Sequence, residues 1–469
     1  MSQSLLMQSA RVVDGSGRAP FMSQALLLQN ARVIDGTGRA PFEASLLIEG
    51  DTIVAVGADA DARAASMPQL QRIDLSGRSV MPGLIDGHVH STFDDAAGHD
   101  ELFYHRRPGM AAITAARNVR KMLCSGLTGF FDPDSIFDLG VDLKEAINHG
   151  VIEGPRMVVG GYALMTSVGG AAGRLMPDHG TMAYARLVRG KDELVAEVRR
   201  QIKIGCDWIK VHVTGSLSHR RSEGELVTFS MEELRTICDA AHDFGVPVAG
   251  HCRSAKSIIM SLEAGFDQII HGTFMDDAAL DAMVKHGALL VPALTFQANL
   301  MEFGGAIHAS PGLQEIFRKE IEQSAEMFHK AYKAGVPMLC GTESGFSVTP
   351  YGDWHYREME VFVRHLGLTP LEAIRCCTEY GSHVMRMKDK VGTLQAGRLA
   401  DLLVVNGDPS KDVTVVGQKD KLEGVMLGGR WIDLTQQAPE RRPLPEWRCH
   451  DFGEILTKDI VNAARQAKH

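Results

Sequence analysis

The sequence predicts a closed (β/α)8 TIM barrel, an α/β fold, with a small discontinuous β-sandwich domain built from both chain ends. Three observations support this prediction. Short apolar or β-branched runs alternate with longer helical patterns in the middle of the chain, and there are eight such runs. Alternating β and α units predict a parallel sheet, and eight units predict that it closes. Short strand patterns with Gly and Asp turns flank this region on both sides.

The expected barrel spans residues 81–385. Two of its helices begin at recognisable capping boxes, Ser230 with Glu233 and Thr369 with Glu372. The eight strand candidates lie at 83–90, 128–132, 156–161, 208–213, 247–252, 268–273, 289–294 and 337–343.

The remaining segments are assigned by their strand and helix patterns. Strand patterns at 22–80 and 386–435 are expected to form the two parts of the β-sandwich, and 436–469 a C-terminal tail with one helix. Residues 1–21 nearly duplicate 22–42, differing at five of 21 positions. Two copies are too few to stack into a repeat architecture. The first copy is therefore interpreted as an N-terminal extension, an alternative start or a cloning remnant, and no function is assigned to it.

Composition excludes several classes of function. The chain of 469 residues has a net charge of −9, which gives no reason to expect nucleic acid or an anionic membrane as partner. No apolar run approaches the roughly 20 residues that span a bilayer, and no signal-peptide pattern is present. The eight cysteines show no CxxC spacing and are interpreted as reduced thiols of a cytoplasmic protein.

The segment MPGLIDGHVH ends in His88 and His90. Residues i and i+2 of a strand point to the same face, so both imidazoles project together at the C-terminal end of the first barrel strand. Active sites of such barrels assemble at that end. Two converging imidazoles suit a divalent metal.

Other expected strand ends add candidate ligands. His251, His271 and Glu343 close the fifth, sixth and eighth strands. A single histidine in a strand is more often a satisfied core residue, and His212 is interpreted in that way, packing against a helix. The joint placement of several ligand types at one rim is what favours a metal site.

Lys210 lies within the apolar run WIKVHV. A buried lysine without an acidic neighbour is costly, although most such lysines simply extend their amine to water. The alternative is that the amine has reacted with CO2, since two carbamate oxygens can bridge two cations. Four histidines, this lysine and Glu343 would then hold a binuclear centre with metals about 3.5–4 Å apart.

As a set, MPGLIDGHVH, IKVHVTGS, VAGHC, IIHGT, GTESG and VGTLQAGRLADLLVVNGDP resemble the amidohydrolase superfamily. The chain looks most like its imidazolonepropionase-like branch, which includes Xaa-Pro dipeptidases and carboxypeptidase-like enzymes, with molinate and phenylurea hydrolases nearby. The resemblance covers about residues 22–435. It implies a metal-dependent barrel hydrolase with a small β-sandwich.

The resemblance also implies a role for each ligand. His88 and His90 would bind the more buried metal, and His251 and His271 the other, with Lys210 bridging them. The strand-eight carboxylate of the family contacts the metal and takes the proton of the attacking hydroxide.

The chain departs from the family pattern at three positions. Glu343 stands where the family usually has Asp, so the metal-to-carboxylate geometry must differ. Phe229 replaces a Tyr expected before the following helix. Arg253 follows a ligand by two residues, and we expect it either to bind a substrate carboxylate or to pair with a surface acid. His219 and His355, in loops after strands four and eight, are further candidates to line the substrate pocket.

The sequence thus predicts an enzyme that hydrolyses an amide-type C–N bond in a small molecule: an N-acyl amino acid, a dipeptide, a carbamate or a urea. The expected cofactor is a divalent transition metal, zinc, with one or two ions per chain. An organophosphate or ester hydrolase on the same site is one alternative, and a non-catalytic barrel scaffold is another. By resemblance alone, the chain is expected to form a homo-oligomer.

Overall fold

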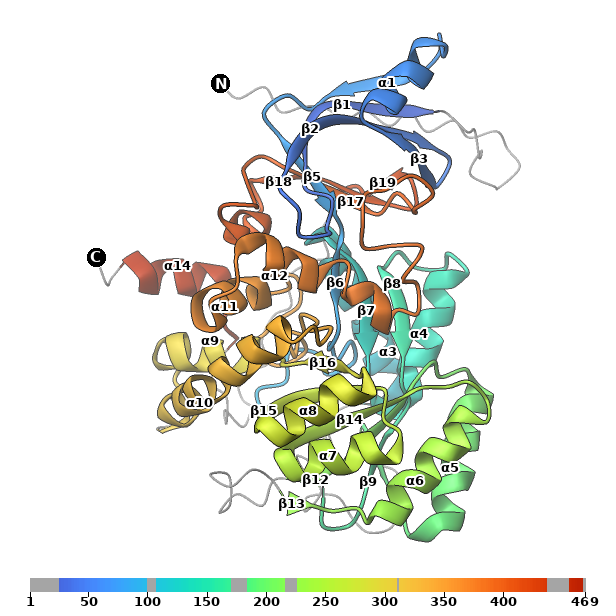
Figure 1. Cartoon of the computed structure of the whole chain (residues 1–469), viewed down its shortest axis with the longest axis vertical. Helices are drawn as coiled ribbons and strands as arrows, with labels where there is room; N and C mark the ends of the chain where they lie inside the picture. The colour runs from blue at the N-terminus through green and yellow to red at the C-terminus, as the bar shows by residue number, and fades with distance from the viewer. Residues whose placement is uncertain are drawn as a thin grey trace.

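The computed structural model describes residues 25–98, 107–169, 184–215, 226–309, 312–436 and 455–466. The first copy of the duplicated segment, residues 1–21, and the candidate His219 lie outside these ranges. Within them, a β-rich unit built from both ends of the chain lies at one end of the molecule, and a larger α/β unit forms the rest (Figure 1).

The β-rich unit is one eight-stranded sheet, whereas the sequence predicted a sandwich of two sheets. Its strand order is β19-β18-β17-β5-β1-β2-β3, with β4 paired to β1. Because β5 pairs with β1 in parallel and with β17 antiparallel, it joins the strands from the two chain ends. The strands are β1 (Leu26–Val33), β2 (Phe42–Glu49), β3 (Thr52–Val56), β4 (Gln71–Asp74), β5 (Ser79–Pro82), β17 (Leu402–Val405), β18 (Leu422–Leu427) and β19 (Arg430–Trp431).

This sheet curves so that β1–β3 face β17–β19 (Figure 1). Leu28 and Leu46, from the N-terminal strands, share one buried cluster with Leu402 and Met426, from the C-terminal strands. A single core therefore holds together segments that are several hundred residues apart in sequence.

The larger unit contains two parallel sheets instead of the predicted single closed ring. One has the order β6-β7-β8 and the other β10-β9-β11-β14-β15-β16. Their strands are β6 (Leu84–Asp86), β7 (Leu127–Asp132), β8 (Arg156–Val159), β9 (Ala163–Met165), β10 (Ala185–Leu187), β11 (Ile209–His212), β14 (Val248–Ser254), β15 (Gln268–Phe274) and β16 (Leu289–Val291), and a separate pair is formed by β12 (Thr214–Gly215) and β13 (Leu226–Val227).

The eighth predicted strand, 337–343, forms no ladder and pairs only through the isolated bridge between Met338 and Leu290. Two local features explain this. Pro337 has no N–H to donate, and Glu343 has a φ of 55°, which ends the extended path. Individual hydrogen bonds still hold the segment beside the first strand, since Gly87 N donates to Cys340 O at 2.7 Å.

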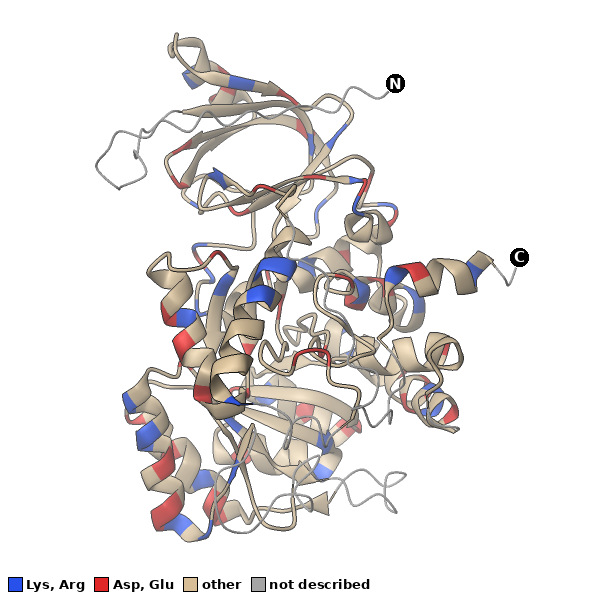
Figure 2. Ribbon diagram, turned by 180° about the vertical axis from the view of Figure 1, so that it is seen from behind, with Lys and Arg blue, Asp and Glu red and all other residues tan. Residues whose placement is uncertain are grey.

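Helices alternate with these strands and cover them from outside. The capping boxes predicted at Ser230 and Thr369 are both present. Lys and Arg are mixed with Asp and Glu along the outer helices (Figure 2). The α-helices are α1 (Ala58–Ala65), α3 (Pro108–Cys124), α4 (Leu139–Asn148), α5 (Gly190–Ile204), α6 (Met231–His242), α7 (Ala255–Ala264), α8 (Asp277–His286), α9 (Thr295–Phe303), α10 (Leu313–Lys333), α11 (Arg357–Leu366), α12 (Pro370–Cys377), α13 (Gly381–Val384) and α14 (Lys458–Gln466).

Three short 3-10 helices complete the described elements: η1 (Ile136–Asp138), η4 (Gly304–Ile307) and η5 (Val413–Gly417). Among the described residues, every helix is too short or too polar to span a lipid bilayer.

The shared core of the β-rich unit makes a stability prediction. Leu402 is fully buried and pairs with strands on both sides. Leu402→Ala should lower the free energy of unfolding by about 2–5 kcal/mol, because it leaves a cavity between the two chain ends. Urea denaturation followed by circular dichroism measures this. Val284→Ala on α8, where the side chain is 50% exposed, is the matched control and should change stability by less than about 0.5 kcal/mol. Equal effects of the two substitutions would contradict the shared core.

Candidate metal centre

The centre begins at the end of β6, where Asp86 connects the first strand to the eighth segment. Its carboxylate accepts hydrogen bonds from the backbone N–H of His88 at 3.1 Å and from the Thr342 hydroxyl at 2.5 Å. His355 Nδ1 lies 3.0 Å from Oδ2, the same oxygen that accepts from Thr342. The backbone that carries His88 is therefore held against the backbone that carries Glu343.

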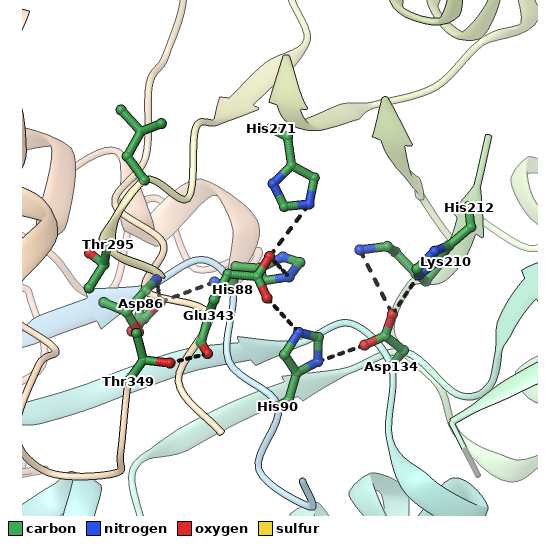
Figure 3. A network of polar contacts seen from close by, with 12 residues as sticks. Asp86, His88, His90, Asp134, Lys210, His212, His271, Thr295, Glu343 and Thr349 are labelled. Carbon is green, nitrogen blue, oxygen red and sulfur yellow. Dashed lines mark hydrogen bonds and ion pairs between the residues drawn. The ribbon is translucent and has the colours of Figure 1, made fainter. Parts of the chain in front are cut away.

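Glu343 lies in the middle of three imidazoles (Figure 3). Its Oε1 is 3.2 Å from His88 Nε2 and 3.5 Å from His271 Nε2, and its Oε2 is 3.0 Å from His90 Nε2. The backbone N–H of Glu343 donates to His88 O, and its carbonyl accepts from the Thr349 hydroxyl. Backbone contacts on both sides thus fix where this carboxylate points.

Two of these ligand candidates have left-handed backbone conformations. His271 has a φ of 74° and Glu343 a φ of 55°. Such conformations cost about 1–3 kcal/mol each outside glycine and persist where the surroundings over-determine them. Here they turn both side chains inward, toward His88.

A second group of side chains surrounds Asp134, in the loop after β7. One carboxylate oxygen is 2.7 Å from His90 Nδ1, and the other is 3.1 Å from His212 Nε2 and 3.9 Å from Lys210 Nζ (Figure 3). His251 connects the two groups, because its ring stacks on His212 at 4.9 Å and meets the edge of His271 at 4.4 Å.

Burial controls the charges of this centre. It lowers the pKa of His271 well below its usual value and also lowers that of His88, which favours the neutral form of both rings. Burial alone would raise the pKa of Glu343, but its electrostatic interactions and hydrogen bonds with His88 and His90 outweigh burial and hold that pKa well below its ordinary range. Burial also lowers the pKa of Lys210, against the opposing effect of Asp134.

The donor set fits a divalent cation. Ligand atoms of His88, His271 and Glu343 all lie within 4.8 Å of one another. Neutral imidazoles with one ionised carboxylate are the donors that zinc and similar metals prefer. All three side chains are largely shielded from solvent, with Glu343 the most exposed at 13%.

The remaining sequence candidates make contacts of other kinds. Phe229 is 4% exposed and belongs to the main hydrophobic core. Arg253 forms an ion pair with the buried Glu320 at 2.6 Å. His355 is 2% exposed and its Nδ1 contacts the Asp86 carboxylate, so it helps to position the end of the first strand.

Sequence reasoning missed Asp134 and misplaced His212. Side chains alternate along a strand, so His212 shares a face with Lys210, two residues earlier, and this signal should have placed it in the centre. Asp134 follows the strand end at Asp132 by two residues. No local pattern indicates that its carboxylate turns toward the first strand.

Buried imidazoles and a carboxylate that meet at the C-terminal ends of parallel strands define the class of metal-dependent hydrolases. Residues 79–432 match the amidohydrolase family, and the chain belongs to that family. It is accordingly an enzyme that hydrolyses amide-type C–N bonds, and metal dependence is implied by the family. The resemblance inferred from the sequence motifs is confirmed.

Individual relatives agree with this assignment. The chain is similar to ochratoxinase of Aspergillus niger, with 27% identity over 412 residues that cover 82% of each chain. It is also similar to imidazolonepropionase of Erwinia tasmaniensis, with 23% identity over 389 residues that cover 76% of this chain and 85% of the relative. The structure of a Xaa-Pro dipeptidase with bound methionine superposes with a TM-score of 0.74 at 28% identity, covering 87% of this chain and 100% of the other. Such neighbours imply a TIM barrel with a second domain.

The contacts of Glu343 predict the outcome of shortening it. Glu343→Asp would withdraw the carboxylate by one methylene from three imidazole contacts, and a displacement of about 1 Å can cost about a hundredfold in rate. We therefore expect kcat/KM to fall about a hundredfold. Glu326→Asp, on an exposed face of α10, is the control and should be neutral. A faster Glu343→Asp enzyme would show that the site is built for aspartate.

Proposed function

We propose that this enzyme hydrolyses the amide bond of an N-acyl amino acid or dipeptide with an apolar acyl portion, using zinc. The observation that carries the proposal is the carboxylate of Glu343 among three buried imidazoles. Relatives named as an ochratoxinase and a Xaa-Pro dipeptidase support an amide substrate.

Aromatic side chains beside the centre support an apolar acyl portion. Phe93 stacks on the His90 ring at 4.1 Å, and Phe346 meets the edges of both rings. Phe296 extends this wall, with its ring 5.3 Å from Phe346. Phe296 and Phe346 are only half-buried, so they can exchange water for an apolar group of the substrate.

Arg253 already has a partner and is not free to bind a substrate carboxylate. Its guanidinium is already paired with Glu320 at 2.6 Å and is 13% exposed. A substrate carboxylate would have to compete with that ion pair. For this reason carbamates and ureas, which carry no carboxylate, belong in the same substrate screen.

Glu343 carries the proton in the proposed reaction. Because its pKa is held well below the ordinary range, the carboxylate is ionised at neutral pH and can accept the proton of the attacking water. It then delivers that proton to the departing nitrogen. A divalent cation held by His88, His90, His271 and Glu343 would supply Lewis acidity, which lowers the pKa of water toward 7 and polarises a carbonyl oxygen.

We also propose a carbamate on Lys210, with His251 as a ligand of a second cation. Lys210 is 1% exposed, and its lowered pKa favours the neutral amine, the form that attacks CO2. The nitrogen forms a bond to the carbon of CO2 and releases one proton to solvent. The rings of His251 and His271 are 4.4 Å apart, which places both near the same side of the centre.

The state of the cysteines is consistent with a reducing compartment. Seven described cysteines are free thiols, six of them buried, and none pairs with another in a disulfide. Free thiols are usual in cytoplasmic proteins. We accordingly propose that the enzyme acts in the cytoplasm.

Elemental analysis combined with a hydrolysis screen tests the proposed function. The purified enzyme should contain one or two zinc ions per chain, and chelator treatment should abolish hydrolysis, with recovery when zinc is added back. In the screen, N-acyl amino acids and dipeptides with aromatic or branched acyl groups should be hydrolysed faster than the matched acetyl compounds, because the aromatic wall contacts the larger group. An enzyme without stoichiometric metal that is indifferent to chelator would refute the metal mechanism.

The carbamate has its own test. Lys210→Ala should lower activity and metal content by more than the roughly 10–100-fold typical of outer-shell partners, because a bridging ligand is lost. Formate in solution should restore part of the activity by taking the position of the carbamate. Lys285→Ala, at an exposed position of α8, is the control. Unchanged metal content and no effect of formate would show that Lys210 acts as an amine.

A further inference from the structure

Asp134 is a deeply buried carboxylate beside the ligand histidines, and the proposed mechanism does not use it. It is 1% exposed and comes from a loop, not from a barrel strand end. Its oxygens contact His90 Nδ1 at 2.7 Å and His212 Nε2 at 3.1 Å. A buried carboxylate is expensive unless it is paired, so these contacts account for its position.

We propose that Asp134 is a positioning residue of the metal centre: it holds the proton of His90 on Nδ1 and so directs Nε2 toward Glu343. The inference rests on the proposed function. Carboxylates that contact the outer nitrogen of a metal-binding histidine fix its tautomer and orientation and raise its basicity. His90 has this arrangement, since its two nitrogens face Asp134 and Glu343 in turn (Figure 3).

The loop around Asp134 does not need this carboxylate to keep its place. Asp132 contacts the Ser91 hydroxyl, and Ile136 N donates to Thr92 Oγ1 at 2.9 Å. Both contacts tie the loop to the residues that directly follow His90. The loop backbone is therefore positioned by the residues that follow His90, and the Asp134 side chain is available to act on the imidazole.

Phe93 and Asp134 restrict different motions of His90. Phe93 stacks on the ring with planes only 2° apart, which limits tilting. Stacking is equally compatible with the orientation reached by a flip of half a turn about the Cβ–Cγ bond, which would exchange Nδ1 with Cδ2 and Nε2 with Cε1. The contact with Asp134 opposes that flip, because it would lose the charge-assisted contact at Nδ1.

His212 and Lys210 hold Asp134 itself. His212 Nε2 contacts the second oxygen, and Lys210 Nζ lies 3.9 Å from it. Asp134 therefore connects β11 to the end of β6 through its side chain. We conclude that His90 reaches its orientation only when three separate segments of the chain are assembled.

Asp134→Asn and Asp134→Ala test the proposal through zinc affinity and the visible spectrum of the cobalt(II)-substituted enzyme. The alanine variant should bind zinc about 10–100-fold more weakly, with altered cobalt absorption, because the proton of His90 is no longer held on Nδ1 and the orientation of its ring is no longer fixed. The asparagine variant keeps the shape and one acceptor but loses the charge, so an intermediate affinity is expected.

Asp138→Asn is the matched control on the same segment. Asp138 pairs with Arg200 at 2.8 Å and accepts from Tyr162 N, away from the centre. This substitution should leave zinc affinity and the cobalt spectrum unchanged. Thermal unfolding of each metal-free variant shows whether any loss of affinity follows from a general loss of structure.

The outcomes separate this inference from the proposed function. If the wild-type enzyme takes up no metal, the proposed function fails. If the wild type binds zinc and hydrolyses amides while Asp134→Ala matches it in affinity and cobalt spectrum, only the role of Asp134 is overturned. Weaker binding by Asp134→Ala, with a changed spectrum and an unaffected Asp138→Asn control, supports it.

Discussion

The buried carboxylate of Glu343 is the interaction on which the rest of the centre depends. It contacts three imidazole Nε2 atoms at 3.0 to 3.5 Å, and these rings come from β15 and from the segment that directly follows β6. A carboxylate shielded to this degree needs compensating partners. The first strand, the sixth strand and the segment before Glu343 must therefore be in register before the charge is paired. The site forms only when these three segments are correctly packed together.

Two further carboxylates support this arrangement from behind. Asp86 joins the backbone of His88 to that of the eighth segment through Thr342, and Asp134 joins the outer nitrogen of His90 to β11. The contacts of both carboxylates are with the residues that carry or orient the ligands, and not with Glu343. Their place is to hold donors in a fixed direction, which matters because small displacements of reacting groups have large effects on rate.

Most strands could be predicted because each is a short apolar run between turn residues. The capping box at Ser230 has the same advantage, since its signal lies within four residues. The ring of eight strands was overpredicted, because the run ending at Glu343 reads as a strand although Pro337 and a left-handed φ interrupt its pairing. The sandwich was likewise replaced by one curved sheet, since strand patterns do not reveal that β5 pairs on both of its edges.

The sequence by itself determined which residue types act as ligands and that they lie near the C-terminal ends of the parallel strands. It could do so because the spacing of His88 and His90 and the ends of strands are local properties. Only the tertiary structure decided the partners: Asp134 against His90, Glu320 against Arg253, and His355 against Asp86. Each of these contacts joins residues at least 44 positions apart. Nothing in the neighbourhood of either residue encodes such a pairing, because it follows from how the strands and loops pack together.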